Sequence, residues 1–310
     1  MLSPEFAPTW TESEISTDGL CGTLTLPLGA SAIPAVLLLA GSGPVNRDGN
    51  LPGLPNNSLK LLAHALAAQG IAALRVDKRG VGSSQVNATR EQDLRFTRYV
   101  DDALAWRAVL ASLERISAVF LLGHSEGALV ATMAAQGVQG AQVAGLILVA
   151  GAGEAAPKII ARQLAAAGVP PALQEASQHI AACLCEGDTA PNVPAELAQF
   201  YRPSIMNYLA SWFTLDPANE FAKTCCPALV VQGSTDLQVG VADAHRLAAA
   251  RPDATLCLVE GMNHILKMAP VDRTANLQTY SMPQLPLAQA LVERIVNFIR
   301  SAEQSASARR

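Results

Sequence analysis

The sequence predicts an α/β protein built on a mostly parallel, doubly wound sheet. Strand-sized apolar runs, such as 33–40, 118–122 and 143–150, alternate along the chain with stretches of helical periodicity. These runs are apolar throughout, which is typical of parallel strands that are covered on both faces. Because strands and helices alternate instead of forming separate blocks, helices are expected on both sides of one sheet.

The remaining core elements follow from the same patterns. A loosely alternating stretch at 13–28 predicts an antiparallel opening hairpin. Three further strands are expected at 71–76, 227–233 and 255–259. One helix is expected to begin at the cap Asn57-Ser58, and two more to cover about 94–114 and about 240–250. A last amphipathic helix is expected to carry Leu287, Leu291, Ile295 and Phe298 on one face.

The alternation stops at Gly151-Ala152-Gly153. Residues 154–222 have helical patterns, are divided by seven prolines, and contain no convincing strand. Six of the 14 aromatic residues lie in this stretch, about twice the share of an even distribution: Phe200, Tyr201, Tyr208, Trp212, Phe213 and Phe221. We therefore expect a lid with an apolar underside. The alternative is that these rings only join the lid helices to one another.

The domain organisation follows from this interruption. A length of 310 residues with 50% hydrophobic content suits one large core with an insertion. We expect the core to comprise residues 1–153 and 223–300, with the helical lid at 154–222. The small, polar tail at 301–310 has no apolar face and is expected to be disordered.

Charge and apolar content exclude several classes of partner. A net charge of −4 gives no electrostatic reason to bind nucleic acid or an anionic membrane. Apolar runs stay below the roughly 18 residues of a membrane span. The first residues have neither a basic start nor an apolar signal region, so a cytoplasmic location is expected.

Neither a metal nor a cofactor is expected. The six cysteines lack metal-ligand spacing and are predicted to be buried, reduced thiols: Cys21, Cys183, Cys185, Cys225, Cys226 and Cys257. The sequence contains no phosphate-binding Gly-x-x-x-x-Gly-Lys motif and no dinucleotide fingerprint.

The most informative motif is Gly123-His124-Ser125-Glu126-Gly127, between an apolar run and the small-residue stretch 128–131. A strand, a tight turn and a helix in this order match the Gly-x-Ser-x-Gly nucleophile elbow. There the serine lies at the apex of a strained turn, and a Cβ on either glycine would collide with neighbouring backbone.

Loops at the carboxyl ends of parallel strands meet at one edge of the sheet. The informative loops there are Gly41–Asn50, Gly123–Gly127, Gly233–Asp236 and Gly261–His264. They predict Ser125 as a nucleophile, His264 as its general base and Asp236 as the acid that orients the histidine. His64 and His245 lie in expected helices, His179 in the lid, and His124 is expected to point across the elbow. Asp243 is the rival acid, but its position within an expected helix favours Asp236.

The order serine, acid, histidine resembles that of the α/β-hydrolase superfamily over roughly residues 20–300. Within it, the chain is similar to bacterial carboxylesterases with Gly41-Ser42-Gly43-Pro44, then Arg47-Asp48, and the elbow Gly-His-Ser-Glu-Gly. The loop Asp77–Ser84 also resembles the Asp-x-Arg-Gly-x-Gly-x-Ser motif of the superfamily. The resemblance implies an oxyanion hole formed by the backbone amides of Ser42 and Glu126, with Gly43 as the alternative to Ser42.

Four charged residues of neighbouring loops have complementary signs: Arg47, Asp48, Asp77 and Arg79. We interpret them as a network that holds the oxyanion loop, although Arg47 or Arg79 is an alternative ligand for a substrate carboxylate. The expected function is carboxylic ester hydrolysis on a small or medium acyl ester, through a covalent acyl-enzyme and without a cofactor. The alternatives are a serine aminopeptidase, thioesterase or acyltransferase, and a ligand-binding protein on the same scaffold.

Overall fold

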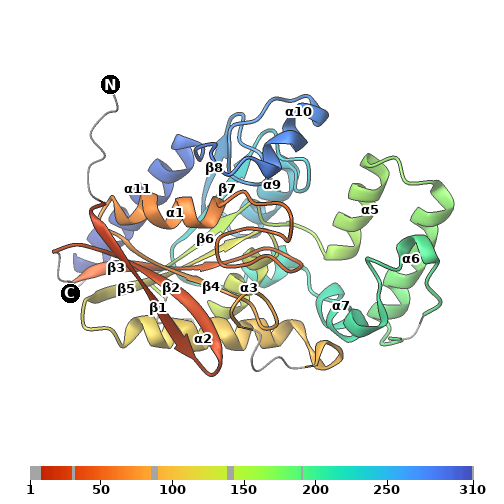
Figure 1. Ribbon diagram of the computed structural model, residues 1–310, viewed down its shortest axis with the longest axis horizontal. Coiled ribbons are helices and arrows are strands. Elements are labelled where there is room, and N and C mark those ends of the chain that lie inside the picture. Colours follow the sequence, from red (N-terminus) through yellow and green to blue (C-terminus); the bar gives the residue numbers. More distant parts are fainter. Residues whose placement is uncertain (1–7, 30–31, 85–89, 138–142, 190, 309–310) are drawn as a thin grey trace.

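The computed structural model describes residues 8–29, 32–84, 90–137, 143–189 and 191–308. Within them, eight strands form one sheet in the order β1-β2-β4-β3-β5-β6-β7-β8 (Figure 1). The strands are β1 (Trp10–Thr17), β2 (Leu20–Pro27), β3 (Ile33–Leu39), β4 (Ala72–Val76), β5 (Ile116–His124), β6 (Gly145–Val149), β7 (Ala228–Gly233) and β8 (Thr255–Val259). The β1–β2 and β2–β4 pairs are antiparallel, and every later pair is parallel. The predicted fold class and opening hairpin are confirmed.

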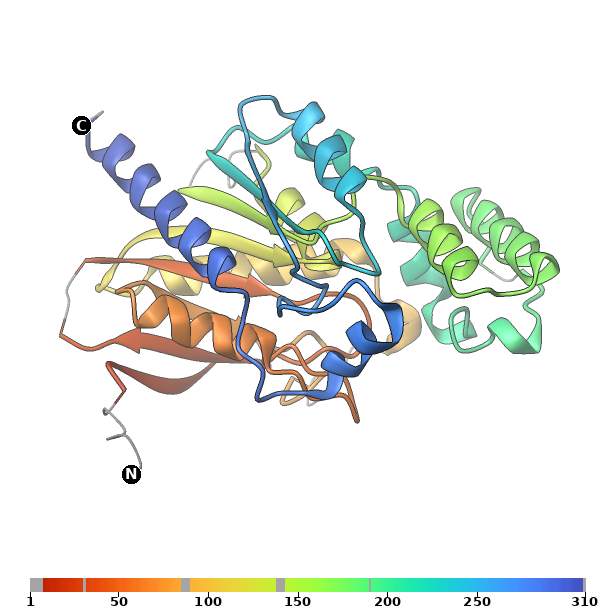
Figure 2. The same cartoon turned by 90° about the horizontal axis from the view of Figure 1, so that it is seen from above.

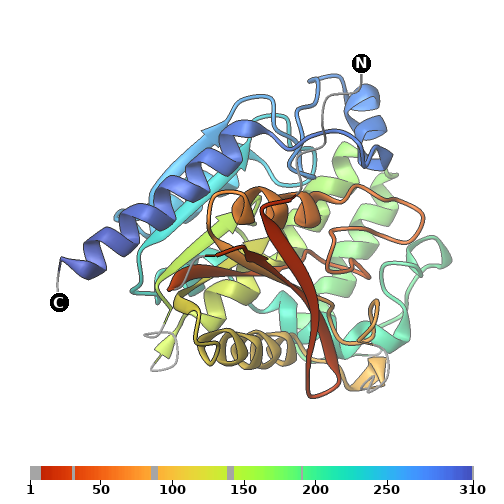
Figure 3. The ribbon, with the colours of Figure 1, turned by 60° about the vertical axis from the view of Figure 1, so that its left-hand side comes forward.

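Helices cover both faces of the sheet (Figure 3). The core helices are α1 (Ser58–Ala67), α2 (Phe96–Ala111), α3 (Glu126–Ala134), α9 (Val241–Ala250), α10 (Arg273–Gln278) and α11 (Gln289–Ser307), with short 3₁₀ turns η1 (Glu91–Asp93) and η4 (Thr279–Ser281). Side chains of α1 and α11 belong to one buried cluster. Those of α2, α3 and α9 belong to the other, so each face of the sheet has its own apolar layer.

The burial of β3 explains why its sequence is apolar without alternation. Leu37 and Leu38 are adjacent and therefore point to opposite faces of the sheet. Both are 0% exposed, Leu37 within the α2–α3 layer and Leu38 within the α1–α11 layer. A polar residue at either position would meet an apolar layer.

Residues 154–222, the helical segment, connect β6 to β7. Its elements are α5 (Ala156–Ala166), α6 (Pro171–Cys185), η2 (Ala195–Leu197), η3 (Pro203–Ile205), α7 (Met206–Phe213) and α8 (Pro217–Phe221). The described part of this segment contains no strand. In Figures 1 and 2, α5, α6 and α7 lie together beyond one end of the sheet. The segment is thus placed over the strand ends that precede the predicted site loops.

The prediction of a disordered tail from residue 301 is wrong for residues 301–307. These residues extend α11, which runs to Ser307. Adding residues to an existing helix costs far less than nucleating one, and this tail contains neither glycine nor proline. The helix therefore continues through residues 301–307 although they have no apolar face. Residues 309–310 of the predicted tail lie outside the described residues.

The start of α1 is where the sequence placed it, but the predicted side-chain cap is not formed. Asn57 adopts a left-handed conformation (φ 57°) and makes no side-chain cap to the helix. Its side chain instead accepts a hydrogen bond from Asn50 Nδ2 at 2.8 Å. The backbone carbonyl of Asp48 accepts from the amides of Leu59 and Lys60 and takes the place of the cap.

Candidate active site

The turn between β5 and α3 has the geometry of a nucleophile elbow. Ser125 is the single residue between them and adopts φ 56° and ψ −122°, a conformation that is strained for a residue with a Cβ. A Cβ on Gly123 would lie 2.0 Å from the carbonyl oxygen of Gly127, and one on Gly127 would lie 2.3 Å from that of Leu39. The predicted requirement for both glycines is confirmed, and the Ser125 side chain lines a cavity.

Asp236 and His264 come together from the loops that follow β7 and β8. His264 Nδ1 lies 2.8 Å from Asp236 Oδ2, and the Asp236 side chain is 0% exposed. Its other oxygen accepts from the backbone amides of Gln238 and Val239 at 2.8 and 3.0 Å. Gln232 Nε2 donates to Oδ2 at 3.1 Å. The carboxylate is therefore held in place from three directions.

This environment determines the tautomer of His264. Burial alone raises the pKa of Asp236, but the His264 ring and the two backbone amides outweigh burial and lower it. An ionised carboxylate only accepts hydrogen bonds, so His264 Nδ1 carries the proton. In the neutral imidazole the lone pair then lies on Nε2, the atom that would act as the predicted general base.

His124 links the elbow to the histidine loop. Its Nε2 donates a hydrogen bond to the backbone carbonyl of His264 at 2.7 Å, and the two imidazole centroids are 4.9 Å apart. Burial, and then the nearby His264 ring, lower the pKa of His124 to about 4. A neutral ring is thus clamped between Ser125 and the loop of His264. Sequence reasoning assigned no role to His124, because only the fold brings residues 124 and 264 together.

Asp243, the rival acid, is occupied elsewhere. It lies within α9, as expected, but in the first turn and not in the middle of the helix. Its carboxylate accepts two hydrogen bonds from Arg162 Nη2, at 2.9 and 2.8 Å, and one each from the amides of Gly153 and Gly240. These contacts give Asp243 a structural task, holding α9 to the start of the helical segment.

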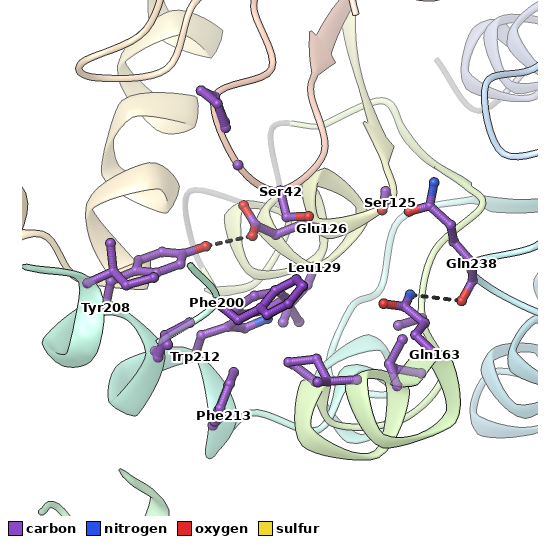
Figure 4. A pocket seen from close by; sticks show the side chains of 18 of the residues that line it. Ser42, Ser125, Glu126, Leu129, Gln163, Phe200, Tyr208, Trp212, Phe213 and Gln238 are labelled. Carbon is purple, nitrogen blue, oxygen red and sulfur yellow. Dashed lines mark hydrogen bonds between the residues drawn. The ribbon is translucent and has the colours of Figure 1, made fainter. Parts of the chain in front are cut away.

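The loop that contains Ser42 passes beside the elbow. A Cβ on Gly41 would lie 3.0 Å from the Cβ of Ser125, so a side chain at position 41 would require the loop or Ser125 to shift. Ser42, Ser125 and Glu126 line the same cavity (Figure 4). The structure therefore brings both predicted oxyanion residues to the cavity wall that carries Ser125.

Two of the four charged loop residues form the predicted network, and the other two bind elsewhere. Asp77 Oδ1 accepts from the backbone amide of Arg47 at 2.7 Å, and Oδ2 accepts from Arg47 Nε at 2.9 Å. Asp48 pairs with Arg75 instead. Arg79 is bound by both oxygens of Asp102, at 2.7 to 2.9 Å, so its place in the network was wrong. These partners are far away in sequence and carried no signal.

A second group of polar side chains lies against the elbow and was missed by sequence reasoning. The Glu126 carboxylate is buried, with Lys78 Nζ 3.9 Å from Oε1 and the Tyr208 hydroxyl donating to Oε2 at 2.6 Å (Figure 4). Burial raises the pKa of Glu126, with Lys78 and Tyr208 opposing that shift. Burial also lowers the pKa of Lys78 against the opposing effect of Glu126. The three residues come from the loop after β4, the elbow, and α7 of the helical segment.

The cavity at the elbow has a volume of about 1070 Å³ and lies between the core and the helical segment. Five of the six aromatic residues of the segment line it: Phe200, Tyr201, Tyr208, Trp212 and Phe213. Aliphatic side chains complete this wall: Leu129, Ile159, Ile160 and Leu164. The sixth ring, Phe221, is fully buried and contacts Arg251. The expected apolar underside is therefore present, with rings also packing on one another at Tyr208 and Trp212.

The expectations about metal ions, cysteines and membrane spans can be compared with the structure. Among the described residues, no group of three or more histidine, cysteine or acidic side chains could hold a metal ion. All six cysteines are free thiols, but each is partly or fully exposed, so their predicted burial is wrong. Helices long and apolar enough to cross a bilayer are also missing from the described chain.

Comparisons with known proteins agree with the fold. Residues 56–195 match the family model described as serine aminopeptidase, S33. Est1E of Butyrivibrio proteoclasticus, solved with ferulic acid, superposes with a TM-score of 0.59 over 93% of this chain and 99% of its own, at 16% identity. Esterase Pf2001 of Pyrococcus furiosus gives 0.57 over 94% and 90%, also at 16% identity. The chain has the α/β-hydrolase fold.

Among curated proteins, the chain is similar to Esterase EstD of Thermotoga maritima. The two are 25% identical over 274 residues, which represent 84% of this chain. The chain spans only 62% of the length of EstD. The chain thus resembles a bacterial esterase in sequence and shares its fold with the two solved esterases.

Proposed function

We propose that this α/β-hydrolase is a carboxylic ester hydrolase that acts through Ser125, His264 and Asp236. Two observations carry the proposal: the Asp236–His264 hydrogen bond of 2.8 Å, and a serine in elbow geometry at the wall of an apolar cavity. His124, next to that serine in sequence, is hydrogen-bonded to the backbone carbonyl of His264. The similarity to EstD supports ester chemistry. Neither a metal nor a cofactor enters the proposed reaction.

In the proposed reaction, His264 Nε2 removes the hydroxyl proton of Ser125 as Oγ attacks the ester carbonyl carbon. The carbonyl oxygen becomes an oxyanion, which the backbone amides of Ser42 and Glu126 stabilise. Protonated His264 returns the proton to the departing alkoxide, leaving an acyl-enzyme. Water, deprotonated by His264, then hydrolyses the acyl group and restores Ser125.

We further propose that the core comprises residues 1–153 and 223–300 and that the helical segment is a lid. Its aromatic and aliphatic side chains would bind the acyl chain, because apolar burial is the main source of affinity in such a pocket. A volume of about 1070 Å³ is ample for a small or medium acyl ester. The lid would also exclude water from the acyl-enzyme until it opens.

The test is hydrolysis of p-nitrophenyl esters from acetate to palmitate by wild type, Ser125→Ala and Ser177→Ala. Ser177 is a matched control, because it is buried in α6 and hydrogen-bonded to Tyr201. We expect Ser125→Ala to lose at least about 10⁴-fold in kcat and all labelling by a fluorophosphonate. Full activity in Ser125→Ala would rule out the proposed nucleophile.

Amide hydrolysis is the second candidate, and the match to the serine aminopeptidase model favours it. The same serine and histidine would attack an aminoacyl amide, with an amine as the leaving group. Parallel assays with p-nitrophenyl esters, thioesters and aminoacyl p-nitroanilides separate the two. An amidase kcat/KM above that for every ester would replace the esterase assignment.

A further inference from the structure

Glu126 creates an electrostatic problem for the proposed reaction. Its backbone amide is a proposed oxyanion donor, yet the same residue carries a carboxylate that is only 2% exposed. A negative charge beside a developing oxyanion raises the energy of the tetrahedral intermediate, most of all in a water-poor site. An α/β-hydrolase with this residue therefore needs to neutralise the carboxylate and hold it away from the reacting atoms.

Lys78 neutralises the Glu126 carboxylate and also binds the loop that contains Ser42. Its Nζ lies 3.9 Å from Glu126 Oε1 and donates to the backbone carbonyl of Gly41 at 2.5 Å. Gly41 is the residue before the proposed donor Ser42. One ammonium group thus balances the charge of Glu126 and fixes the position of the loop that carries the second donor.

Tyr208, on the helical segment, holds the Glu126 carboxylate away from the reacting atoms. Its hydroxyl donates to Glu126 Oε2 at 2.6 Å, and Figure 4 shows the ring reaching from α7 toward Glu126. The Tyr208 hydroxyl is buried, and its hydrogen bond to Glu126 keeps it from being an unpaired buried polar group. Tyr208 is thus hydrogen-bonded to Glu126, and Lys78 to Gly41. The two pairs are joined by the ion pair of 3.9 Å between Lys78 Nζ and Glu126 Oε1, an oxygen with no hydrogen-bond partner among the described residues.

We propose that Tyr208 and Lys78 are positioning residues that neutralise Glu126 and align the oxyanion donors, so that the donors are aligned only while α7 is docked. This inference rests on the proposed function of Ser125 and its oxyanion hole. It assigns the helical segment a part in the chemical step in addition to binding the acyl chain.

The first test compares Tyr208→Phe with Ser177→Ala. Ser177 is the matched control, because its buried hydroxyl is also hydrogen-bonded within the helical segment, to the Tyr201 hydroxyl at 2.7 Å, but lies on α6 outside the Glu126 contacts. We expect Tyr208→Phe to lower kcat about tenfold with KM nearly unchanged, since a displaced donor weakens transition-state binding selectively. Ser177→Ala should keep kcat. Equal kcat values for Tyr208→Phe and wild type would overturn the proposal.

The second test uses charge rescue. Lys78→Met leaves the Glu126 carboxylate buried without its counter-charge, and we expect kcat to fall about a hundredfold. Glu126→Gln added to Lys78→Met removes that charge while keeping the backbone amide, and should restore about tenfold of the loss. A double variant no faster than Lys78→Met would show that Lys78 does not act through Glu126.

The third test does not depend on ester hydrolysis. Amide hydrogen exchange of the 39–46 peptide, in the full chain, should be several-fold faster in Tyr208→Phe than in wild type or Ser177→Ala. Unchanged exchange in Tyr208→Phe would overturn the coupling from α7 to the loop. A wild-type protein that hydrolyses no ester would overturn the proposed function instead, so the two failures are distinguishable.

Discussion

The imidazole of His124 donates to the backbone carbonyl of His264 at 2.7 Å, with the two rings 4.9 Å apart. The residue before the proposed nucleophile thereby supports the loop of the proposed base. Burial, and then the neighbouring His264 ring, disfavour the protonated form of His124, although the hydrogen bond to the carbonyl favours it.

The burial of His124 predicts that the fold is sensitive to acid. The pKa of His124 is lowered to about 4, so on acidification the unfolded chain binds a proton before the native state does. Stability is therefore lost as pH falls from about 6.5 toward 4, at about 1.4 kcal/mol per pH unit. Between pH 7 and 5, the unfolding free energy of wild type should fall by about 2 kcal/mol more than that of His124→Gln. Urea denaturation at both pH values measures this, and parallel pH slopes would contradict it.

The two candidate acids can be separated by one pair of variants. Asp236→Asn should lower kcat by about 10³- to 10⁴-fold, because it favours the wrong tautomer of His264. Asp243→Asn should keep most of kcat but lower the unfolding free energy by about 2 kcal/mol, because it weakens the bonds from Arg162 and Gly153. Ester kinetics and thermal unfolding of both variants decide the matter; the opposite pattern would exchange the two roles.

The packing of the elbow against β3 predicts that Gly127→Ala is strongly destabilising. The added Cβ would lie 2.3 and 2.7 Å from the carbonyl oxygens of Leu39 and Ala40, which are backbone atoms and cannot turn away. We expect a loss of about 3 kcal/mol in unfolding free energy. Gly240→Ala is the control, because its Cβ would meet nothing nearer than 3.9 Å. Similar stabilities of the two variants would contradict the prediction.

The buried Arg47–Asp77 pair predicts a large effect of removing one partner. Asp77→Ala leaves the Arg47 guanidinium, whose side chain is 10% exposed, with only Glu14 as a counter-charge. Breaking a buried pair in this way costs about 3–5 kcal/mol. Asp101→Asn disrupts the exposed pair with Arg98 and should cost less than about 0.5 kcal/mol. Chemical denaturation provides both values, and equal costs would show that the Asp77 pair contributes little.

The cavity wall predicts how acyl-chain preference can be changed. Ile160 lines the cavity and is partly exposed to it, so Ile160→Trp should fill space that a longer acyl chain would occupy. We expect kcat/KM for p-nitrophenyl octanoate to fall at least about tenfold while that for acetate is retained. The acetate rate is the internal control for folding and chemistry. Equal losses on both esters would place the acyl chain elsewhere.

The parts of the fold that were predicted correctly depend on local sequence. Strands 33–40 and 143–150 were recognisable because burial on both faces makes a run such as Val36-Leu37-Leu38-Leu39 apolar throughout. The requirement for Gly123 and Gly127 was recognisable because a strand–turn–helix of this tightness leaves no room for a Cβ. The loops after β5, β7 and β8 were placed together by the geometry of parallel sheets alone.

The missed features all depend on contacts between distant segments. Glu126 is adjacent to Ser125 in sequence, but its partners Lys78 and Tyr208 lie 48 and 82 positions away. Arg79 was assigned to the wrong network for the same reason, since nothing local to it indicates Asp102. A charged residue in a loop shows that it needs a partner, and only the three-dimensional arrangement shows which one it has.

The direct pairing of β6 with β7 has a consequence for engineering of this protein. Two neighbouring parallel strands need a connection that crosses from one end of the sheet to the other, whatever else that connection contains. Here Leu146 pairs with Ala228, although the 69 residues at 154–222 lie between the two strands in sequence. A graft of another segment between these strands would keep Ser125, Asp236 and His264 on the core loops but would remove Tyr208, the partner of Glu126.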